Sequence, residues 1–320
     1  MPLVDSLEVS IYHKGGLMEK GRIINLCGGV YKVLMENGEI ESLKARGKLR
    51  SEKTYQVNTK SLSKKKDVQF VKNSPKVGDI VLIDNNMIDS YLPRKNEMIR
   101  PDISNVDQIL LVFAAKEPDF SFYLLDLFIV NILKEKIKPL ITISKIDKLT
   151  KEELDDLKSK MSYYEKLGYD VLYVNSLNKE GIEDLKEHLK GKITVLSGQT
   201  GAGKSTLINA ILPEFSLRTQ EISKSLGRGK HTTRETNLYM YEDGFIGDTP
   251  GFSKLDLSSI DKDDIKDLFE EFKDYKCFFK DCNHKENIKG CQIHEAANNG
   301  SILKSRYESY LKMYQLKENK

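Results

Sequence analysis

The sequence predicts an α/β protein whose parallel sheet is preceded by a small β-rich module and followed by a helical, metal-binding segment. Three observations lead to this expectation. Strand-length apolar runs alternate with amphipathic helical patterns over residues 106–212, short strands and turns fill residues 21–92, and three cysteines and a histidine gather in residues 277–291. Such alternation is typical of a mostly parallel sheet with helices on both faces. At 320 residues the chain is long enough for two or three domains.

Composition favours a globular protein of the cytoplasm. Apolar residues make up 39% of the chain, and no apolar run approaches the roughly 18–20 residues of a membrane span. The N-terminus lacks the basic and then apolar layout of a signal peptide. We therefore expect no contact with a membrane. The net charge of +3 is uneven, since residues 18–100 contain 17 Lys or Arg and 10 Asp or Glu. A basic N-terminal module indicates a polyanionic partner.

Residues 1–17 are expected to be a non-native or upstream extension. Lys14-Gly15-Gly16 can be encoded by AAA-GGA-GGN, which has the form of a ribosome-binding site, shortly before Met18. We therefore expect the natural chain to start at Met18 and the extension to have no function.

Residues 18–92 are expected to form a small β-barrel. Four short strand patterns occur there, and Asn37-Gly38 predicts a hairpin turn between two of them. An OB-fold, common among nucleic-acid-binding proteins, fits this pattern, and so does an SH3-like barrel. Residues 44–76 are expected to be a basic loop containing Lys64–Lys66, either an RNA contact or a harmless insertion.

A linker from Pro93 to Pro101 leads into the α/β region. We expect strands at 106–115, 139–144, 170–174 and 193–196, with helices at 122–136, 152–167 and 181–189. In such a sheet, ligands bind at the carboxyl ends of the strands.

The fourth of these strands leads into a P-loop. Residues 198–205 read G-x-x-x-x-G-K-S and are followed by an apolar helical pattern. The glycines allow backbone N–H groups to meet phosphate oxygens at a helix N-terminus, Lys204 can reach the β and γ phosphates, and the Ser205 hydroxyl can bind Mg²⁺. The expected nucleotide contacts are Ser197, Gly198, Gln199, Thr200, Gly201, Ala202, Gly203, Lys204, Ser205 and Thr206.

Polar residues at two other strand ends indicate guanine as the base. In Ser144-Lys145-Ile146-Asp147, the carboxylate can accept hydrogen bonds from guanine N1–H and N2–H₂, a pair that adenine does not offer. The Lys145 stem can cover the purine ring, and Ser176 can meet the guanine O6. The expected ligands are therefore GTP and GDP.

Downstream motifs are expected to contact Mg²⁺ and the γ-phosphate. Asp248 follows a strand and suits a Walker B carboxylate, while the Gly251 amide can reach the γ-phosphate. Thr232 or Thr233 can close on the metal, and we assign Thr233 to Mg²⁺ together with Ser205.

The C-terminal cluster predicts one structural zinc. Cys277, Cys282, His284 and Cys291 supply three thiolates and an imidazole, a full tetrahedral set that leaves no position for a reactive water. His294 is a competing ligand, but it is expected to face a helix over 295–317.

The guanine motifs precede the P-loop, so the usual order is circularly permuted. With a barrel before it and a Cys/His cluster after it, the chain from Met18 resembles the ribosome small subunit-dependent GTPase A family. Matching stretches are Arg46–Arg50, Pro93–Asn96, Asn105–Gln108, Glu117–Phe120, the P-loop and Gly229–Thr233.

The resemblance implies a P-loop GTPase domain in permuted order (93–255), an OB-fold barrel (18–92) and a helical zinc domain (256–320). It also implies late maturation of the small ribosomal subunit, contact with its rRNA, and GTP hydrolysis stimulated by that particle. We expect a monomer.

The resemblance points to His231 as a catalytic group beside Lys204 and Thr233. Phe252 stands where many GTPases have a water-orienting glutamine, and a phenyl ring cannot orient water. Ser144 stands where the family usually has asparagine, which predicts weaker nucleotide binding. These two departures keep open an alternative function, a nucleotide-gated RNA-binding scaffold whose hydrolysis is incidental.

Overall fold

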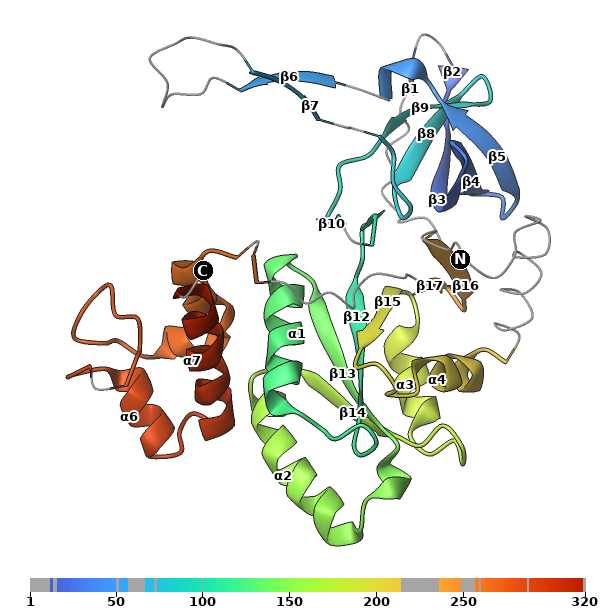
Figure 1. Ribbon diagram of the computed structural model, residues 1–320. Coiled ribbons are helices and arrows are strands. Elements are labelled where there is room, and N and C mark those ends of the chain that lie inside the picture. The colour runs from blue at the N-terminus through green and yellow to red at the C-terminus, as the bar shows by residue number, and fades with distance from the viewer. Residues whose placement is uncertain are drawn as a thin grey trace. The chain divides into compact units, whose positions relative to one another are not determined.

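The computed structural model describes residues 12–13, 16–49, 52–56, 67–71, 74–99, 101–213, 236–248, 257–258, 260–286 and 288–318 (Figure 1). The chain divides into two compact units. The first comprises residues 1–106 and 233–250, and the second comprises residues 107–232 and 251–320. Among the described residues, no helix has the length and apolar character needed to cross a bilayer.

The first unit contains a five-stranded barrel. Its strands pair in the order β3-β4-β5-β9-β8, and β3 also pairs with β8. Only the pairing of β5 with β9 is parallel. Numbered along the chain this order is 1-2-3-5-4-1, which is that of an OB-fold and not of an SH3-like barrel. The strands are β3 (Glu19–Cys27), β4 (Val30–Met35), β5 (Ile40–Ala45), β8 (Ile80–Asp84) and β9 (Met87–Tyr91).

Alternating apolar side chains fill the barrel. Ile23, Val33, Leu43 and Val81 are each at most 2% exposed, as expected of strands with one face turned to a core. Gly38 has φ +87° in the turn between β4 and β5, where its N–H donates to the Met35 carbonyl. The Asn-Gly pair therefore forms the hairpin that it predicts.

A ribbon occupies part of the segment that the sequence predicted as a basic loop. After η1 (Gly47–Leu49), β6 (Glu52–Gln56) pairs antiparallel with β7 (Asp67–Val71). The expectation of a loop was wrong for these ten residues, because both segments are rich in the β-branched and aromatic residues that favour strands. Lys64–Lys66 lie outside the described residues.

A buried carboxylate anchors the linker to the barrel. Asp79 is fully buried, and Arg94 donates to both of its carboxylate oxygens at 2.8 Å. Ser104 donates to the same carboxylate from β11 (Ile103–Ser104), which pairs with β10 (Glu97–Met98). Arg94 of the linker motif is therefore a structural residue.

A hairpin from the second half of the chain also belongs to the first unit. β16 (Asn237–Tyr241) and β17 (Gly244–Asp248) are antiparallel, and Asn237 pairs with Asn25 of β3. β17 occupies the place where the sequence predicted a strand leading to Asp248, and Asp248 is its last residue.

The second unit is built on four parallel strands in the order β14-β13-β12-β15. Figure 1 shows α1 and α2 on one side of this sheet and α3 and α4 on the other. All seven residues of β12 are buried, as expected where helices cover both faces. The elements are β12 (Gln108–Ala114), β13 (Lys138–Ser144), β14 (Asp170–Val174), β15 (Ile193–Gly198), α1 (Phe122–Lys134), α2 (Lys151–Lys166), α3 (Ile182–Leu189) and α4 (Lys204–Ile211).

The C-terminal segment packs against α1 in this unit. It contains η3 (Lys262–Leu268), η4 (Glu270–Asp274), α6 (Gln292–Asn298) and α7 (Lys304–Glu318). Phe269, Tyr310 and Met313 share a buried cluster with Val130 of α1. The single helix predicted over 295–317 was wrong. Gly300 has φ +81°, a conformation that no α-helix contains, and it separates α6 from α7.

A buried charge network joins α7 to α1, α2 and η4. The Arg306 side chain is 0% exposed and donates to Asp126 at 2.7 Å and to Glu271 at 2.8 Å. The Tyr164 hydroxyl donates to Asp126 at 2.8 Å. The C-terminal segment is thus fixed to the sheet domain by charges as well as by apolar contacts.

Candidate nucleotide-binding and metal sites

The P-loop joins β15 to α4 as a strand, a glycine-rich loop and a helix. Gly198 has φ +125°, and a Cβ added to it would lie 2.0 Å from the Val112 carbonyl oxygen of β12. Only glycine allows the loop to pass this close to the neighbouring strand. Gly203, also at positive φ, directly precedes α4.

Free donors gather at the start of α4. In the part of the chain that the structure describes, the backbone N–H groups of residues 203–206 have no backbone acceptor. The first helical bond runs from Leu207 N–H to the Gly203 carbonyl at 2.9 Å. Unpaired N–H groups at a helix N-terminus form a site for phosphate oxygens. The loop therefore fits the phosphates of a nucleotide.

Lys204 lies over this loop. Its ammonium donates to the carbonyls of Gly198 at 2.9 Å and Gln199 at 2.8 Å. Burial lowers the pKa of Lys204. Ser205, next in the first turn of α4, is exposed, so its hydroxyl is accessible to a metal ion. An ammonium and a hydroxyl at these places suit a Mg²⁺-nucleotide.

Ser144 connects the end of β13 to the P-loop. It is 2% exposed, and its hydroxyl oxygen lies 2.6 Å from the Ala202 carbonyl oxygen and 3.1 Å from that of Phe113. A hydroxyl has one proton and can donate fully to only one of the two carbonyls. Serine does bridge to the P-loop here, with one donor hydrogen where an asparagine amide has two.

Lys145 forms a second connection to the same loop. Its ammonium donates to the Gly201 carbonyl at 2.8 Å and also to the Glu117 carbonyl. Its Cε would lie 3.7 Å from a Cβ placed on Gly203, so the aliphatic stem runs alongside the loop. The base motif and the phosphate motif are therefore one connected structure.

Residues 117–119 also contact the P-loop, a role that the sequence analysis did not assign to them. The Gln199 side-chain amide donates to the Asp119 carbonyl at 3.1 Å, and Pro118 Cδ would lie 3.5 Å from a Cβ on Gly201. These residues follow β12, whose carboxyl end lies at the same edge as those of its parallel neighbours. Their position directly after a parallel strand was therefore the feature of the sequence that could have predicted this contact.

The other guanine-motif residues lie at the ends of neighbouring strands. Asp147 is exposed in η2 (Ile146–Lys148), directly after β13. Ser176 is half-buried after β14, in a turn where the Asn175 side chain accepts from the Leu177 N–H at 2.9 Å. Asp248 is the last residue of β17 in the first unit. His231, Thr233 and Gly251 lie outside the described residues.

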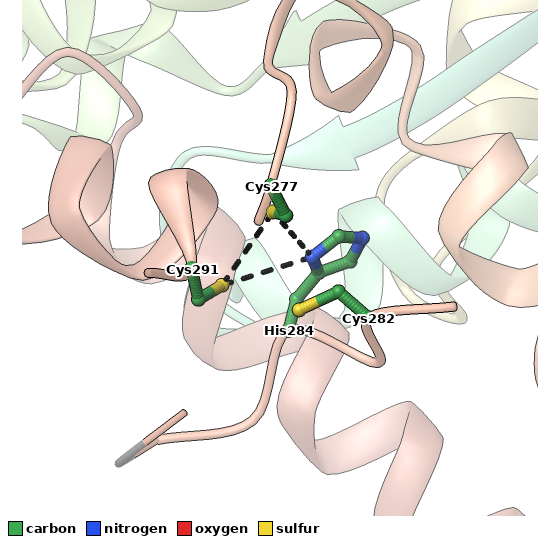
Figure 2. A group of neighbouring side chains, drawn as sticks. All are labelled: Cys277, Cys282, His284 and Cys291. Carbon is green, nitrogen blue, oxygen red and sulfur yellow. Dashed lines mark hydrogen bonds between the residues drawn. The ribbon is translucent and has the colours of Figure 1, made fainter. Parts of the chain in front are cut away.

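The C-terminal segment brings the four predicted zinc ligands together. Figure 2 shows Nδ1 of His284 directed at the sulfurs of Cys277 and Cys291, with Cys282 beside them. Cys277 Sγ lies 3.5 Å from this nitrogen and 3.9 Å from Cys291 Sγ, and one ligand atom from each of the four residues lies within 4.8 Å of the others.

The distances among the ligand atoms of Cys277, His284 and Cys291, 3.5–3.9 Å, are close to those of a tetrahedral zinc site. Zinc bonds of about 2.3 Å to sulfur and about 2.0 Å to nitrogen place tetrahedral ligands about 3.5–3.8 Å apart. The donor set therefore fits Zn²⁺, which supplies structural cross-linking here and no chemistry, because four protein ligands complete its coordination.

The surroundings of His284 and Cys291 favour the uncharged forms of these two ligands. Burial lowers the pKa of His284 to about 4 and raises the pKa of Cys291 to about 12. Zinc binding must therefore displace thiol protons. His294 is not in the cluster, since its Nε2 lies 3.1 Å from the Asn298 side-chain nitrogen on α6.

Comparison with known proteins gives consistent matches. The family model described as RsgA GTPase matches residues 91–258. "Small ribosomal subunit biogenesis GTPase RsgA" of Onion yellows phytoplasma is 42% identical over 93% of this chain and 97% of its own length. The protein of the same name from Halalkalibacterium halodurans is 39% identical over 92% and 95%.

Solved structures agree with these matches. YjeQ from Thermotoga maritima has a TM-score of 0.77 and 32% identity, covering 95% of this chain and 100% of its own. YloQ, described as a circularly permuted GTPase, has a TM-score of 0.74 and 30% identity, covering 97% and 98%.

Proposed function

Because the chain belongs to the RsgA GTPase family, we propose that it is a Mg²⁺-dependent GTPase that binds the small ribosomal subunit and acts in its late assembly. The alignment with a relative named for this function carries the proposal, since it covers 93% of the chain and therefore barrel, P-loop and cysteine cluster together. The protein acts as a monomer in the cytoplasm, where it meets the subunit and its rRNA. Residues 18–92, 93–255 and 256–320 are its barrel, GTPase and zinc domains.

Different residues of the chain contact the phosphates, the base and the metal ion of Mg²⁺-GTP. The backbone of residues 197–206 holds the phosphates, Lys204 neutralises their charge, and Asp147 selects guanine. Lys145 and Ile146 support the base, Ser176 meets O6, and Asp248 and Gly251 meet the metal and γ-phosphate side. Mg²⁺, held by Ser205 and Thr233, supplies positive charge at the phosphate oxygens. The contacts of Ser144 and Lys145 with P-loop carbonyls support this division, because base and phosphate sites then move together.

Co-sedimentation with purified small subunits tests the proposed function. We expect binding with a non-hydrolysable GTP analogue, weaker binding with GDP, and single-turnover hydrolysis that subunits accelerate. If small subunits bound the protein in a nucleotide-dependent way but did not accelerate hydrolysis, the result would instead favour the RNA-binding scaffold. The phenyl ring of Phe252, which cannot orient water, would then explain the slow hydrolysis.

Replacing His231 with alanine is expected to slow subunit-stimulated turnover by about 100-fold, because a positioned general base contributes at least that much. GDP affinity is expected to stay unchanged. The measurement is single-turnover hydrolysis with small subunits, and His188→Ala in α3 is the matched control. Near-normal turnover of the His231 variant would remove this residue from the mechanism.

Replacing Ser144 with alanine is expected to weaken GDP binding about fivefold. The change leaves the Ala202 carbonyl without its donor, at a cost of about 1 kcal/mol. Ser144→Asn adds a second donor hydrogen and is expected to tighten binding. Titration with a fluorescent GDP analogue measures both.

Thr142→Val on the same strand is the control, since the buried Thr142 hydroxyl has no partner among the described residues. If Ser144→Ala bound GDP as the unmodified protein does, the bridge to the P-loop would have no part in nucleotide affinity.

A further inference from the structure

Two adjacent phenylalanines beside the zinc ligands are exposed to solvent. Phe278 is 81% exposed and Phe279 is 51% exposed. Their ring centroids lie 5.0 Å apart at an interplanar angle of 85°, so the edge of one ring meets the face of the other. Large apolar side chains exposed side by side indicate a binding surface more strongly than single ones do. The other exposed large apolar residues of the described chain are isolated in sequence: Ile40, Met87, Ile99, Leu177 and Leu316.

The backbone under this aromatic pair is held in place. Phe278 N–H donates to the Gly290 carbonyl at 3.0 Å, and these two residues adjoin the zinc ligands Cys277 and Cys291. A Cβ on Gly290 would lie 2.9 Å from Phe278 Cβ, so the two segments approach as closely as glycine permits. A surface ordered before binding loses less entropy when a ligand arrives.

A hollow of about 430 Å³ lies next to the pair, within the size range of small-ligand pockets. Its walls include Phe272, Tyr275 and both exposed rings. The zinc ligands Cys277, Cys282 and His284 also line it, so its inner part is the place of the metal and its outer part lies beside the exposed rings. Four lysines and one carboxylate, Asp267, also line it. Three of the lysines are exposed and form no ion pair within the described residues: Lys273, Lys276 and Lys280.

We infer that this surface binds an unpaired base of single-stranded RNA, which stacks on Phe278 or Phe279 while the lysines contact the flanking phosphates. Aromatic faces beside a basic rim are the combination that holds single-stranded nucleic acid, because every base has a π-face and every nucleotide a phosphate. A basic rim disfavours a basic protein segment, and an apolar peptide would leave the lysines unused. The inference rests on the proposed rRNA partner and gives that partner a place on the chain.

A tryptophan reporter tests the inference directly, because the chain contains no tryptophan. Phe278→Trp in the full-length, zinc-loaded protein places the sole indole at the proposed stacking position. A ten-nucleotide uridine oligomer is expected to quench its emission, and an abasic oligomer with the same number of phosphates is not. Leu316→Trp, on α7 and 47% exposed, is the matched control and is expected to show no quenching.

Two further variants separate stacking from charge. Phe278→Ala with Phe279→Ala is expected to weaken binding of the oligomer by about 10-fold while zinc content stays at one per chain. Lys280→Gln is expected to reduce the salt dependence of binding without changing the quenching amplitude. Equal quenching by the abasic oligomer, or equal quenching at position 316, would overturn the inference.

The oligomer-binding measurements are independent of the proposed function, since they use neither small subunits nor GTP hydrolysis, and a separate co-sedimentation measurement connects the two. If the double alanine variant lost co-sedimentation with small subunits but bound the oligomer normally, the surface would take a protein partner, and the inference would be wrong while the proposed function stood. If the oligomer quenched the tryptophan emission but the protein did not bind small subunits, the inference would stand and the proposed function would be wrong.

Discussion

Replacing Cys291 with serine is expected to abolish zinc binding and unfold the segment over residues 257–318. Cys291 is 1% exposed and lies in the same buried cluster as Phe272 and Tyr310, so its loss affects both metal and core. Structural zinc binds zinc-finger peptides with about 10–16 kcal/mol of apparent free energy at pH 7. An ordinary domain is stabilised by only about 5–15 kcal/mol, so the loss of even part of the zinc-binding free energy is enough to unfold this segment.

The measurements are a metal assay and thermal unfolding followed by circular dichroism. Cys27→Ser, in β3 of the other unit, is the control and is expected to retain one zinc per chain. Strong chelation of the unmodified protein should reproduce the effect of Cys291→Ser. A serine variant that kept one zinc and its melting temperature would show that these residues do not form a structural metal site.

Replacing Arg306 with methionine is expected to destabilise the second unit by about 3–5 kcal/mol, because it leaves Asp126 and Glu271 buried without their partner. Chemical denaturation measures the change. Lys304→Met is the matched control on the same helix. The Lys304 side chain is 81% exposed and its pair with Glu308 spans 4.0 Å, so we expect an effect below about 1 kcal/mol.

A combined variant distinguishes charge from volume. Adding Asp126→Asn and Glu271→Gln to Arg306→Met removes the unpaired charges and is expected to recover part of the lost stability. If Arg306→Met cost no more than Lys304→Met, the buried network would make no net contribution to the fold.

Local patterns in the sequence were enough for much of the architecture. The strand and helix around Gly198–Ser205 follow from a motif whose spacing requires them, and the Asn37-Gly38 turn follows from the conformations that its residues allow. The zinc ligands could be chosen because a closed site needs four donors and residues 277–291 supply three cysteines and one histidine, with His294 beyond them as the competing ligand.

Contacts between distant residues could not be predicted in this way. Arg306 looks like any basic residue of a helical pattern, and its burial depends on carboxylates from α1 and η4. The contacts of residues 117–119 with the P-loop depend likewise on the order of strands in the sheet. The ribbon of β6 and β7 was not predicted, because the many lysines of residues 44–76 favoured the interpretation of the whole segment as a loop.

The distance along the chain between Asp126 and Arg306 has a consequence for synthesis. The two residues are 180 positions apart, which at about 5–20 residues per second is roughly 10–40 s of translation. Throughout that interval α1 exists without the counter-ion of its buried carboxylate and without the apolar cover that α7 provides. The synthesis of α7 therefore determines when the second unit becomes stable, and a nascent chain that stalls before Arg306 presents an incomplete core to chaperones and proteases.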